Sequence, residues 1–251
     1  MKKFVIPALI YFQSLIVSAS PYSDIISQAN KAYTDAKFNN AIELYKQVVD
    51  KGYQSAALYY NLGDAYFKTK NYASAILYFE KAKKLDPSDP KIDFNIQVCN
   101  TKIVDKIEEL PQPFYKHWMT DFCNLFTMDI WAIVSVVCLF LFFMFMAVYL
   151  MANAVRIRKA TFWAGLLFLL VTMVSGVNAY SQYRSISNSH EAIIFEPTVN
   201  VKSSPDANSQ DIFVIHEGTK VKILDKVGNW LDVRIANGSD GWIAEGTAQV
   251  I

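Results

Sequence analysis

The stretch from Asn61 to Pro87, NLGDAYFKTKNYASAILYFEKAKKLDP, decides how the first part of this chain folds. Apolar residues recur in it at helical spacing on both sides of a short polar break, which predicts two antiparallel helices joined by a turn. Gly63 and Ala75 are small, so we expect them where the helices approach closely, with aromatic side chains beside them. Pro87 should end the second helix because it has no backbone N–H and clashes with the preceding turn.

A weaker copy of this stretch lies upstream of it. Ala41 and Ala75 stand 34 residues apart in the similar contexts FNNAIELYKQ and YASAILYFEK, and this period is typical of the tetratricopeptide repeat. The copies cover about 22–55 and 56–89, and the second resembles the family at nearly every signature position. Its signature residues are Tyr59, Leu62, Gly63, Tyr66, Ala75, Phe79, Ala82 and Pro87.

The resemblance to tetratricopeptide repeats implies a capping helix and a binding groove. Residues 91–109 read as an amphipathic helix that covers the last repeat and completes a domain over 20–109. The first helices of stacked repeats line a concave groove that holds peptide segments. The candidate groove residues, for an acidic or carboxylate-ended partner segment, are Asn30, Asn61, Lys68 and Lys91. Ile26 stands where that pattern needs a lysine, and the alternative is that the asparagines are only solvated helix residues.

Two long apolar runs, 130–151 and 161–180, contain no charge and are each long enough to cross the roughly 30 Å hydrocarbon core of a bilayer. The basic residues of the intervening loop 152–160 are Arg156, Arg158 and Lys159. Basic residues in short loops stay in the cytoplasm. We therefore expect a two-pass protein of the bacterial inner membrane, with its N- and C-terminal domains in the periplasm.

The N-terminal sequence MKKFVIPALIYFQSLIVSAS agrees with this sidedness. Two lysines precede an apolar stretch that is too short to cross a bilayer, which predicts a secretory signal peptide over 1–19. An uncleaved anchor is the alternative. Both would export the residues from about 20 onward.

Residues 110–129 are rich in aromatic side chains that recur at helical spacing after two prolines. One interpretation is a juxtamembrane helix that lies on the outer leaflet of the membrane. The other is that the aromatic residues pack against the last repeat helix. The residues concerned are Phe114, Trp118, Phe122, Leu125 and Phe126.

After a linker over 181–190, residues 191–251 alternate β-branched with polar residues between turn signals, which predicts five or six short antiparallel strands. The motifs TVNVKSSPD, HEGTKVKIL, GNWLDVRI and GSDGWI resemble a bacterial SH3 domain. The residues expected in its core are Val199, Val201, Val221, Ile223, Val233 and Ile243. Turns that need a positive φ are expected at Gly218, Gly238 and Gly241.

Trp230 and Trp242 are the candidate ligand contacts of this SH3-like domain. Bacterial SH3 domains often bind cell-wall peptides or other proteins, and an exposed aromatic ring could supply the contact. The interpretation we favour from sequence is that both tryptophans close the small core, because so small a domain has little else bulky to bury.

Catalytic and metal-binding patterns are missing from the sequence. The formal net charge of +1 argues against a nucleic-acid partner. The three cysteines and three histidines share no metal-ligand spacing, and no phosphate loop or nucleophile elbow is present. We expect no enzyme activity, no cofactor and no metal. A disulfide between Cys99 and Cys123 is compatible with an oxidising compartment.

The order of these parts resembles the E-type members of the Bacteroides aerotolerance (Bat) family: repeats, an apolar hairpin, then an SH3-like barrel. The resemblance implies a multidomain membrane protein that acts as an interaction scaffold in a stress-tolerance complex. Its partners would be other membrane proteins, including von Willebrand factor A-type proteins. The alternative function is a sensor whose barrel binds cell-wall peptide.

Overall fold

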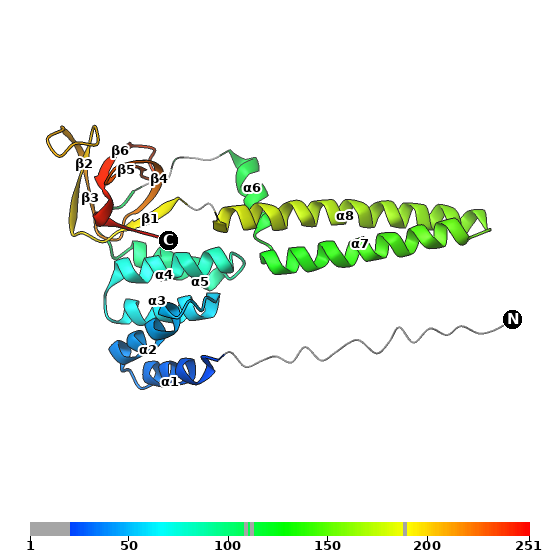
Figure 1. Cartoon of the computed structure of the whole chain (residues 1–251), viewed down its shortest axis with the longest axis horizontal. Helices are drawn as coiled ribbons and strands as arrows, with labels where there is room; N and C mark the ends of the chain where they lie inside the picture. Colours follow the sequence, from blue (N-terminus) through cyan, green and yellow to red (C-terminus); the bar gives the residue numbers. More distant parts are fainter. Residues whose placement is uncertain (1–20, 108–109, 111–112, 188–189) are drawn as a thin grey trace.

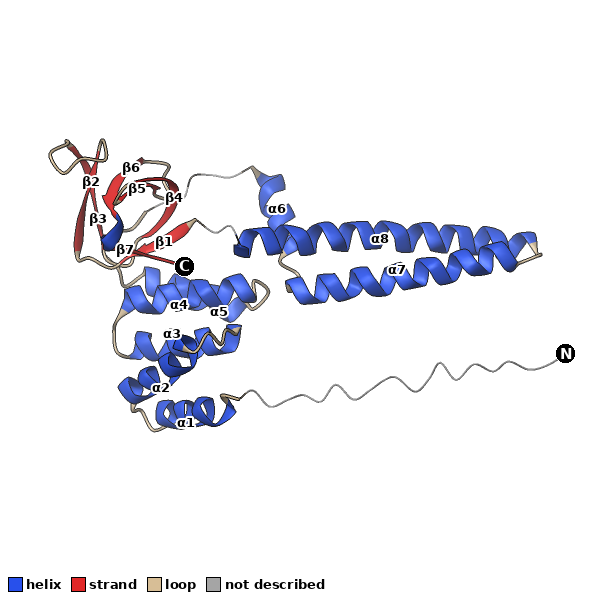
Figure 2. Cartoon of the chain, in the orientation of Figure 1, coloured by secondary structure: helices blue, strands red, loops and turns tan. Residues whose placement is uncertain are grey.

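The computed structural model describes residues 21–107, 110, 113–187 and 190–251, so the expected signal peptide 1–19 lies outside the described residues (Figure 1). A stack of helices and a β-barrel lie together at one end of a long helical hairpin (Figure 2).

Five helices build the repeat region. They are α1 (Ser23–Thr34), α2 (Phe38–Asp50), α3 (Ala56–Lys68), α4 (Tyr72–Leu85) and α5 (Pro90–Asn100). Side chains that accept a hydrogen bond from a free backbone N–H begin three of them, namely Ser55, Asn71 and Asp89. The helix pair expected over Asn61–Pro87 is present, and α4 ends two residues before Pro87.

The helices α3 and α4 approach closely at Gly63, as the sequence indicates. A Cβ atom on Gly63 would stand 2.9 Å from Cδ1 of Phe79 and 3.2 Å from the carbonyl oxygen of Ala75. In the first repeat Ala29 and Ala41 are fully buried and allow a similar approach. Small residues at these places therefore set how tightly each helix pair packs.

The capping helix is shorter than expected. The helix α5 ends at Asn100, and residues 101–107 leave the helix stack and run along the barrel. Lys106 donates hydrogen bonds from Nζ to the carbonyl oxygens of Asn100 and Ile103, at 2.7 and 2.8 Å, and so satisfies carbonyls that a longer helix would have bonded internally. Ile103 packs on the repeat core and Ile107 on the barrel core.

The barrel is a seven-stranded sheet in the order β3-β2-β6-β5-β4-β1-β7, with antiparallel pairs throughout. Its strands are β1 (Glu191–Ile194), β2 (Thr198–Lys202), β3 (Asp211–His216), β4 (Lys220–Val227), β5 (Trp230–Arg234), β6 (Asp240–Ala244) and β7 (Ala248–Val250). Of the six expected core residues, five are buried and Ile223 is partly buried against them.

Two of the three expected turn glycines have a positive φ, which is +89° at Gly218 and +91° at Gly238. Gly241 was also expected to need a positive φ, and this expectation is wrong. A Cβ atom there would stand 2.7 Å from Cγ1 of Val201 and 2.8 Å from the carbonyl oxygen of Lys202, so this glycine permits β2 and β6 to approach.

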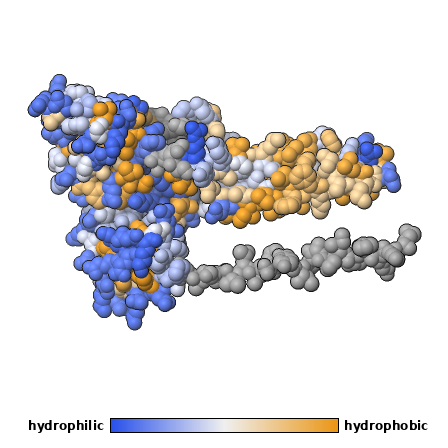
Figure 3. Space-filling view, in the orientation of Figure 1, coloured by the Kyte–Doolittle hydropathy of each residue, from blue (hydrophilic) through white to orange (hydrophobic). Residues whose placement is uncertain are grey.

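Two apolar helices, α7 (Met128–Met151) and α8 (Val155–Ser187), pack against each other as a hairpin. Both are long and apolar enough to cross a membrane. Figure 3 shows that the visible face of the hairpin is mostly apolar, whereas the visible face of the repeats and barrel is mostly polar. The basic residues Arg156, Arg158 and Lys159 lie in the first turns of α8 and not in a nine-residue loop, because arginine, lysine and alanine favour helix.

Candidate interaction surfaces

The first helices of the repeats carry a hydrogen-bonded polar surface. Tyr45 donates from its hydroxyl to Oδ1 of Asn30 at 2.6 Å, and Asn61 donates from Nδ2 to the same oxygen at 3.4 Å. Tyr33 donates to Oδ2 of Asp64 at 2.5 Å. Asn95 of α5 donates from Nδ2 to the hydroxyl oxygen of Tyr60 at 2.9 Å. We call this set the polar repeat surface: Asn30, Tyr33, Tyr60, Asn61, Asp64 and Asn95.

The structure brings together only part of the candidate groove. Asn30 and Asn61 are bonded to each other, but Lys68 and Lys91 are exposed and no described hydrogen bond or ion pair joins either ammonium to the asparagines. Sequence reasoning missed the tyrosines and Asp64. The repeat period could have found some of these residues, because Asp64 stands one period after Asn30 and Asn95 one period after Asn61.

Asp64 and the neighbouring tyrosines set the electrostatics of the polar repeat surface. Burial raises the pKa of Tyr45 to about 12. Burial, and then the hydrogen bond to Asp64, raises the pKa of Tyr33 above its usual range. The hydroxyls of Tyr33 and Tyr45 therefore stay protonated at physiological pH and act as hydrogen-bond donors. Asp64 supplies the carboxylate of the polar repeat surface.

The two tryptophans of the barrel lie outside its core. Trp230 alternates along β5 with buried Leu231, and Trp242 stands between buried Gly241 and Ile243 on β6, so both rings point to the outer face and are half-buried. The interpretation that they close the core is wrong. Residues from outside the SH3-like motifs, such as Ile107 and Ile194, fill the core instead.

Charged residues flank Trp242 in one row across the sheet. Lys202 of β2 and Asp232 of β5 are its partners on either side, and Asp225 of β4 is the next partner of Asp232. Burial, and then the charge of Asp240, raises the pKa of the Asp232 carboxyl. The outer face thus offers an aromatic ring between the Lys202–Asp211 ion pair and the carboxylates of β5 and β4.

A buried junction joins the repeats to the barrel through Asp105, which follows α5. Its Oδ2 accepts from the backbone N–H of His216 at 2.7 Å and from the hydroxyl of Thr219 at 2.6 Å, and its Oδ1 is 2.7 Å from Nδ1 of His216. Burial raises the pKa of Asp105, but these hydrogen bonds outweigh it and the pKa is lowered. Next to it, a Cβ atom on Gly218 would stand 2.5 Å from Cγ2 of Ile103.

The strand β1 makes the second part of the junction. Ile193 is fully buried in the repeat core, whereas its neighbours Ala192 and Ile194 are fully buried in the barrel core. Because successive residues of a strand point to opposite faces, this one strand contributes to both cores. The repeats and barrel therefore form one unit, which we call the head.

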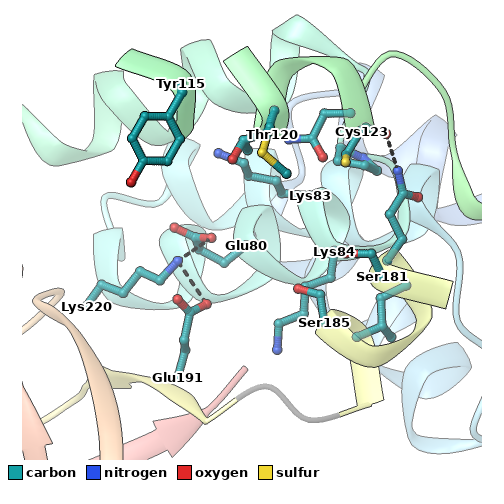
Figure 4. Close-up of a pocket in the computed structure, with 15 residues that line it drawn as sticks. Glu80, Lys83, Lys84, Tyr115, Thr120, Cys123, Ser181, Ser185, Glu191 and Lys220 are labelled. Carbon is teal, nitrogen blue, oxygen red and sulfur yellow. Dashed lines mark hydrogen bonds and ion pairs between the residues drawn. The ribbon is translucent and has the colours of Figure 1, made fainter. Parts of the chain in front are cut away.

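Lys220 of β4 lies at the edge of this junction, between two carboxylates (Figure 4). Its Nζ is 3.0 Å from Oε2 of Glu80 on α4 and 3.1 Å from Oε2 of Glu191 on β1. Burial lowers the pKa of this ammonium, but the two carboxylates outweigh the burial and raise it. These residues border a cavity of about 450 Å³, and residues of α6 (Phe114–Cys123) and of the C-terminal part of α8 complete its lining.

The cysteines are free in the structure. Cys99 is buried in the repeat core, where burial raises the pKa of its thiol to about 12. Cys123, at the end of α6, donates a hydrogen bond to Oδ1 of Asn178 at 2.9 Å, so the disulfide considered from sequence is not formed.

Comparison with known proteins identifies both parts of the head. Residues 26–90 match the tetratricopeptide repeat family and residues 197–249 match the bacterial SH3 domain family. The repeats are 39% identical over 66 residues to "Protein SGT1 homolog" from Oryza sativa subsp. japonica, covering 26% of this chain and 18% of that protein. They are 35% identical over 78 residues to "Tetratricopeptide repeat protein 28" from Mus musculus, covering 31% of this chain and 3% of that protein. The chain thus spans less than a fifth of the length of these curated relatives, and its two matched regions are interaction domains that typically have no catalytic activity.

Proposed function

We propose that this chain is a two-pass inner-membrane scaffold that presents its head to protein partners in the periplasm, within a complex of the Bat type. The observation that carries the proposal is the junction, because one strand shared by two cores holds two interaction domains in a fixed relation at the end of the apolar hairpin. Domains fixed together raise the effective concentration of two partners for each other.

Aromatic residues at the two ends of the hairpin support a membrane-spanning role. Near the turn, Trp163 is exposed and the Arg158 guanidinium lies 5.1 Å from the ring centre of Tyr149. At the other end of α8, Tyr180 and Tyr183 are exposed. From Trp163 to Tyr183 a helix rises about 30 Å, which is the thickness of a hydrocarbon core. Tryptophan and tyrosine prefer both membrane interfaces.

The basic residues at the hairpin turn support the sidedness. A cysteine that replaces Asn153, in this turn, is expected to resist an impermeant thiol reagent in intact spheroplasts, whereas cysteines at Gln47 and Gly246 of the head should react. All three positions are exposed, and a side chain at Gly246 meets open space. Cys123→Ser removes the partly exposed native thiol. Labelling at Asn153 without labelling in the head would contradict the topology.

The polar repeat surface and the lysines beside it are the proposed docking site for a partner's acidic or carboxylate-ended segment, for instance in a von Willebrand factor A-type membrane protein. Lys68→Glu with Lys91→Glu should release a co-purifying partner, because each charge-assisted hydrogen bond contributes about 1.5–3 kcal/mol. The matched control is Lys46→Glu with Lys102→Glu, which makes the same charge change at exposed positions elsewhere in the head. Unchanged partner yield with the first pair would exclude this surface. Release by Asp64→Asn alone would indicate a basic partner segment.

The outer face of the barrel favours a second candidate function, the binding of cell-wall peptide. Trp242 is half-buried beside Asp232, and Lys202 on its other side is paired with Asp211, a combination that can contact both an apolar group and the charges of a peptide. Retention of muropeptides by the purified chain, lost in Trp242→Ala, would support the sensor. Retention of proteins alone would support the scaffold.

A further inference from the structure

The helix α6 carries an apolar surface that the rest of the described chain leaves uncovered. Its exposed fractions are 87% for Phe114, 78% for Trp118, 62% for Met119 and 58% for Tyr115. Of the two interpretations left open by the sequence, the one in which Phe114 and Trp118 pack against the last repeat helix is therefore wrong. Contiguous exposed apolar side chains mark a contact with a protein or a membrane.

Hydrogen bonds fix the C-terminal end of α6 to the hairpin. Gln182 of α8 donates from Nε2 to the carbonyl oxygens of Cys123 and Phe126, at 2.5 and 2.9 Å. Trp131 of α7 donates from Nε1 to the same carbonyl of Cys123 at 2.9 Å, and the Cys123 thiol donates to Asn178. The end of α6 is thus held at the level of Asn178 and Gln182, where the apolar run of α8 ends.

The described residues of the head leave the apolar side chains of α6 largely uncovered. Tyr115 and Met119 line the cavity of about 450 Å³ that separates α6 from α4, and both remain more than half exposed. In Figure 1, α6 crosses the end of α8 instead of running along it. A helix that crosses a spanning hairpin at this level would lie along the membrane surface.

We propose that α6 is a membrane-surface helix whose aromatic side chains enter the boundary between headgroups and acyl chains in the leaflet next to the head. This inference rests on the proposed function, because it requires α7 and α8 to span the bilayer. The structure favours the bilayer as the partner of this apolar surface. The helix α7 begins at Met128, five residues after α6 ends, so the apolar surface of α6 continues into the hairpin. Tryptophan and tyrosine are the side chains that prefer this depth. In this role α6 fixes the height of the head above the membrane.

The experiment places a nitroxide spin label on the full chain in phospholipid nanodiscs, with no other protein present. The test position is Trp118→Cys in a Cys123→Ser background, whose hydroxyl can still donate to Asn178. Phe140→Cys, exposed in the middle of α7, is the reference for lipid, and Phe94→Cys, an exposed aromatic position on α5, is the reference for water. Collision rates with oxygen, which partitions into lipid, are compared with those of a water-soluble nickel chelate.

The label at Trp118 is expected to show an oxygen-to-nickel ratio several-fold above that at Phe94 and below that at Phe140. A ratio equal to that at Phe94, with a lipid-like ratio at Phe140, would overturn the membrane-surface helix and leave the spanning hairpin intact. A water-like ratio at Phe140 would overturn the spanning hairpin, and the inference about α6 with it.

Discussion

Asp105→Ala is expected to lower the free energy of docking between the repeats and the barrel by about 2–4 kcal/mol, because hydrogen bonds to a charged group contribute about 1.5–3 kcal/mol each and the donors lose their acceptor. The Thr219 hydroxyl and the backbone N–H of His216 would be left without this partner at a largely buried site. Hydrogen exchange should rise in β1 and in residues 101–107, while the exchange of α3 changes little. Asp50→Ala, at an exposed end of α2, is the control. Equal exchange in both variants would show that Asp105 does not hold the junction.

The same carboxylate predicts how docking depends on pH. The pKa of Asp105 is lowered in the folded state, below the roughly 3.9 of an unfolded aspartate. Its contribution is therefore complete above about pH 4 and is lost as the pH falls through the lowered folded value. In the parent chain, hydrogen exchange in β1 should rise on acidification as Asp105 becomes protonated. In Asp105→Ala, the increase that is due to this protonation should be missing.

Gly63→Val is expected to lower the free energy of unfolding of the repeats by about 1–3 kcal/mol, the usual range for overpacking a core. The new Cβ would stand 2.9 Å from the ring of Phe79, which is almost fully buried and has little room to move. The backbone carbonyl of Ala75 closes the other side of this contact.

The matched control is Ala57→Val, which introduces the same side chain at an exposed position of the same helix. Thermal unfolding of the full chain in detergent, followed by far-ultraviolet circular dichroism, should separate the two variants by several degrees. Similar melting temperatures would show that α3 and α4 do not pack through Gly63.

The repeat pair, the apolar hairpin and the strand pattern could be read from the sequence because each depends on local periodicity. The spacing of Gly63, Ala75 and Phe79 is a property of one helical hairpin, and the structure places these residues in contact. The length of the capping helix could not be read in this way. Residues 101–107 are amphipathic enough for a helix, but Asp105 bonds to Thr219 and Ile107 packs on the core of a barrel that begins more than eighty residues later.

The tryptophans were misplaced for the same reason. From sequence, the barrel was expected to be an isolated small domain with Trp230 and Trp242 in its core. In the structure, β1 and the segment after α5 complete the core instead. On the polar repeat surface, the Tyr33–Asp64 and Tyr60–Asn95 pairs join different helices, so their contacts depend on how the repeats stack.

The claim that the repeats and barrel form one head is tested most directly by a distance between them. Spin labels at Gln47→Cys and Gly246→Cys, in a Cys123→Ser background, would be measured by double electron–electron resonance on the full chain in nanodiscs. A fixed head predicts a single narrow distance distribution that broadens when Asp105→Ala is added. A broad distribution in the chain with Asp105 intact would contradict a fixed head and, with it, the scaffold that the junction supports.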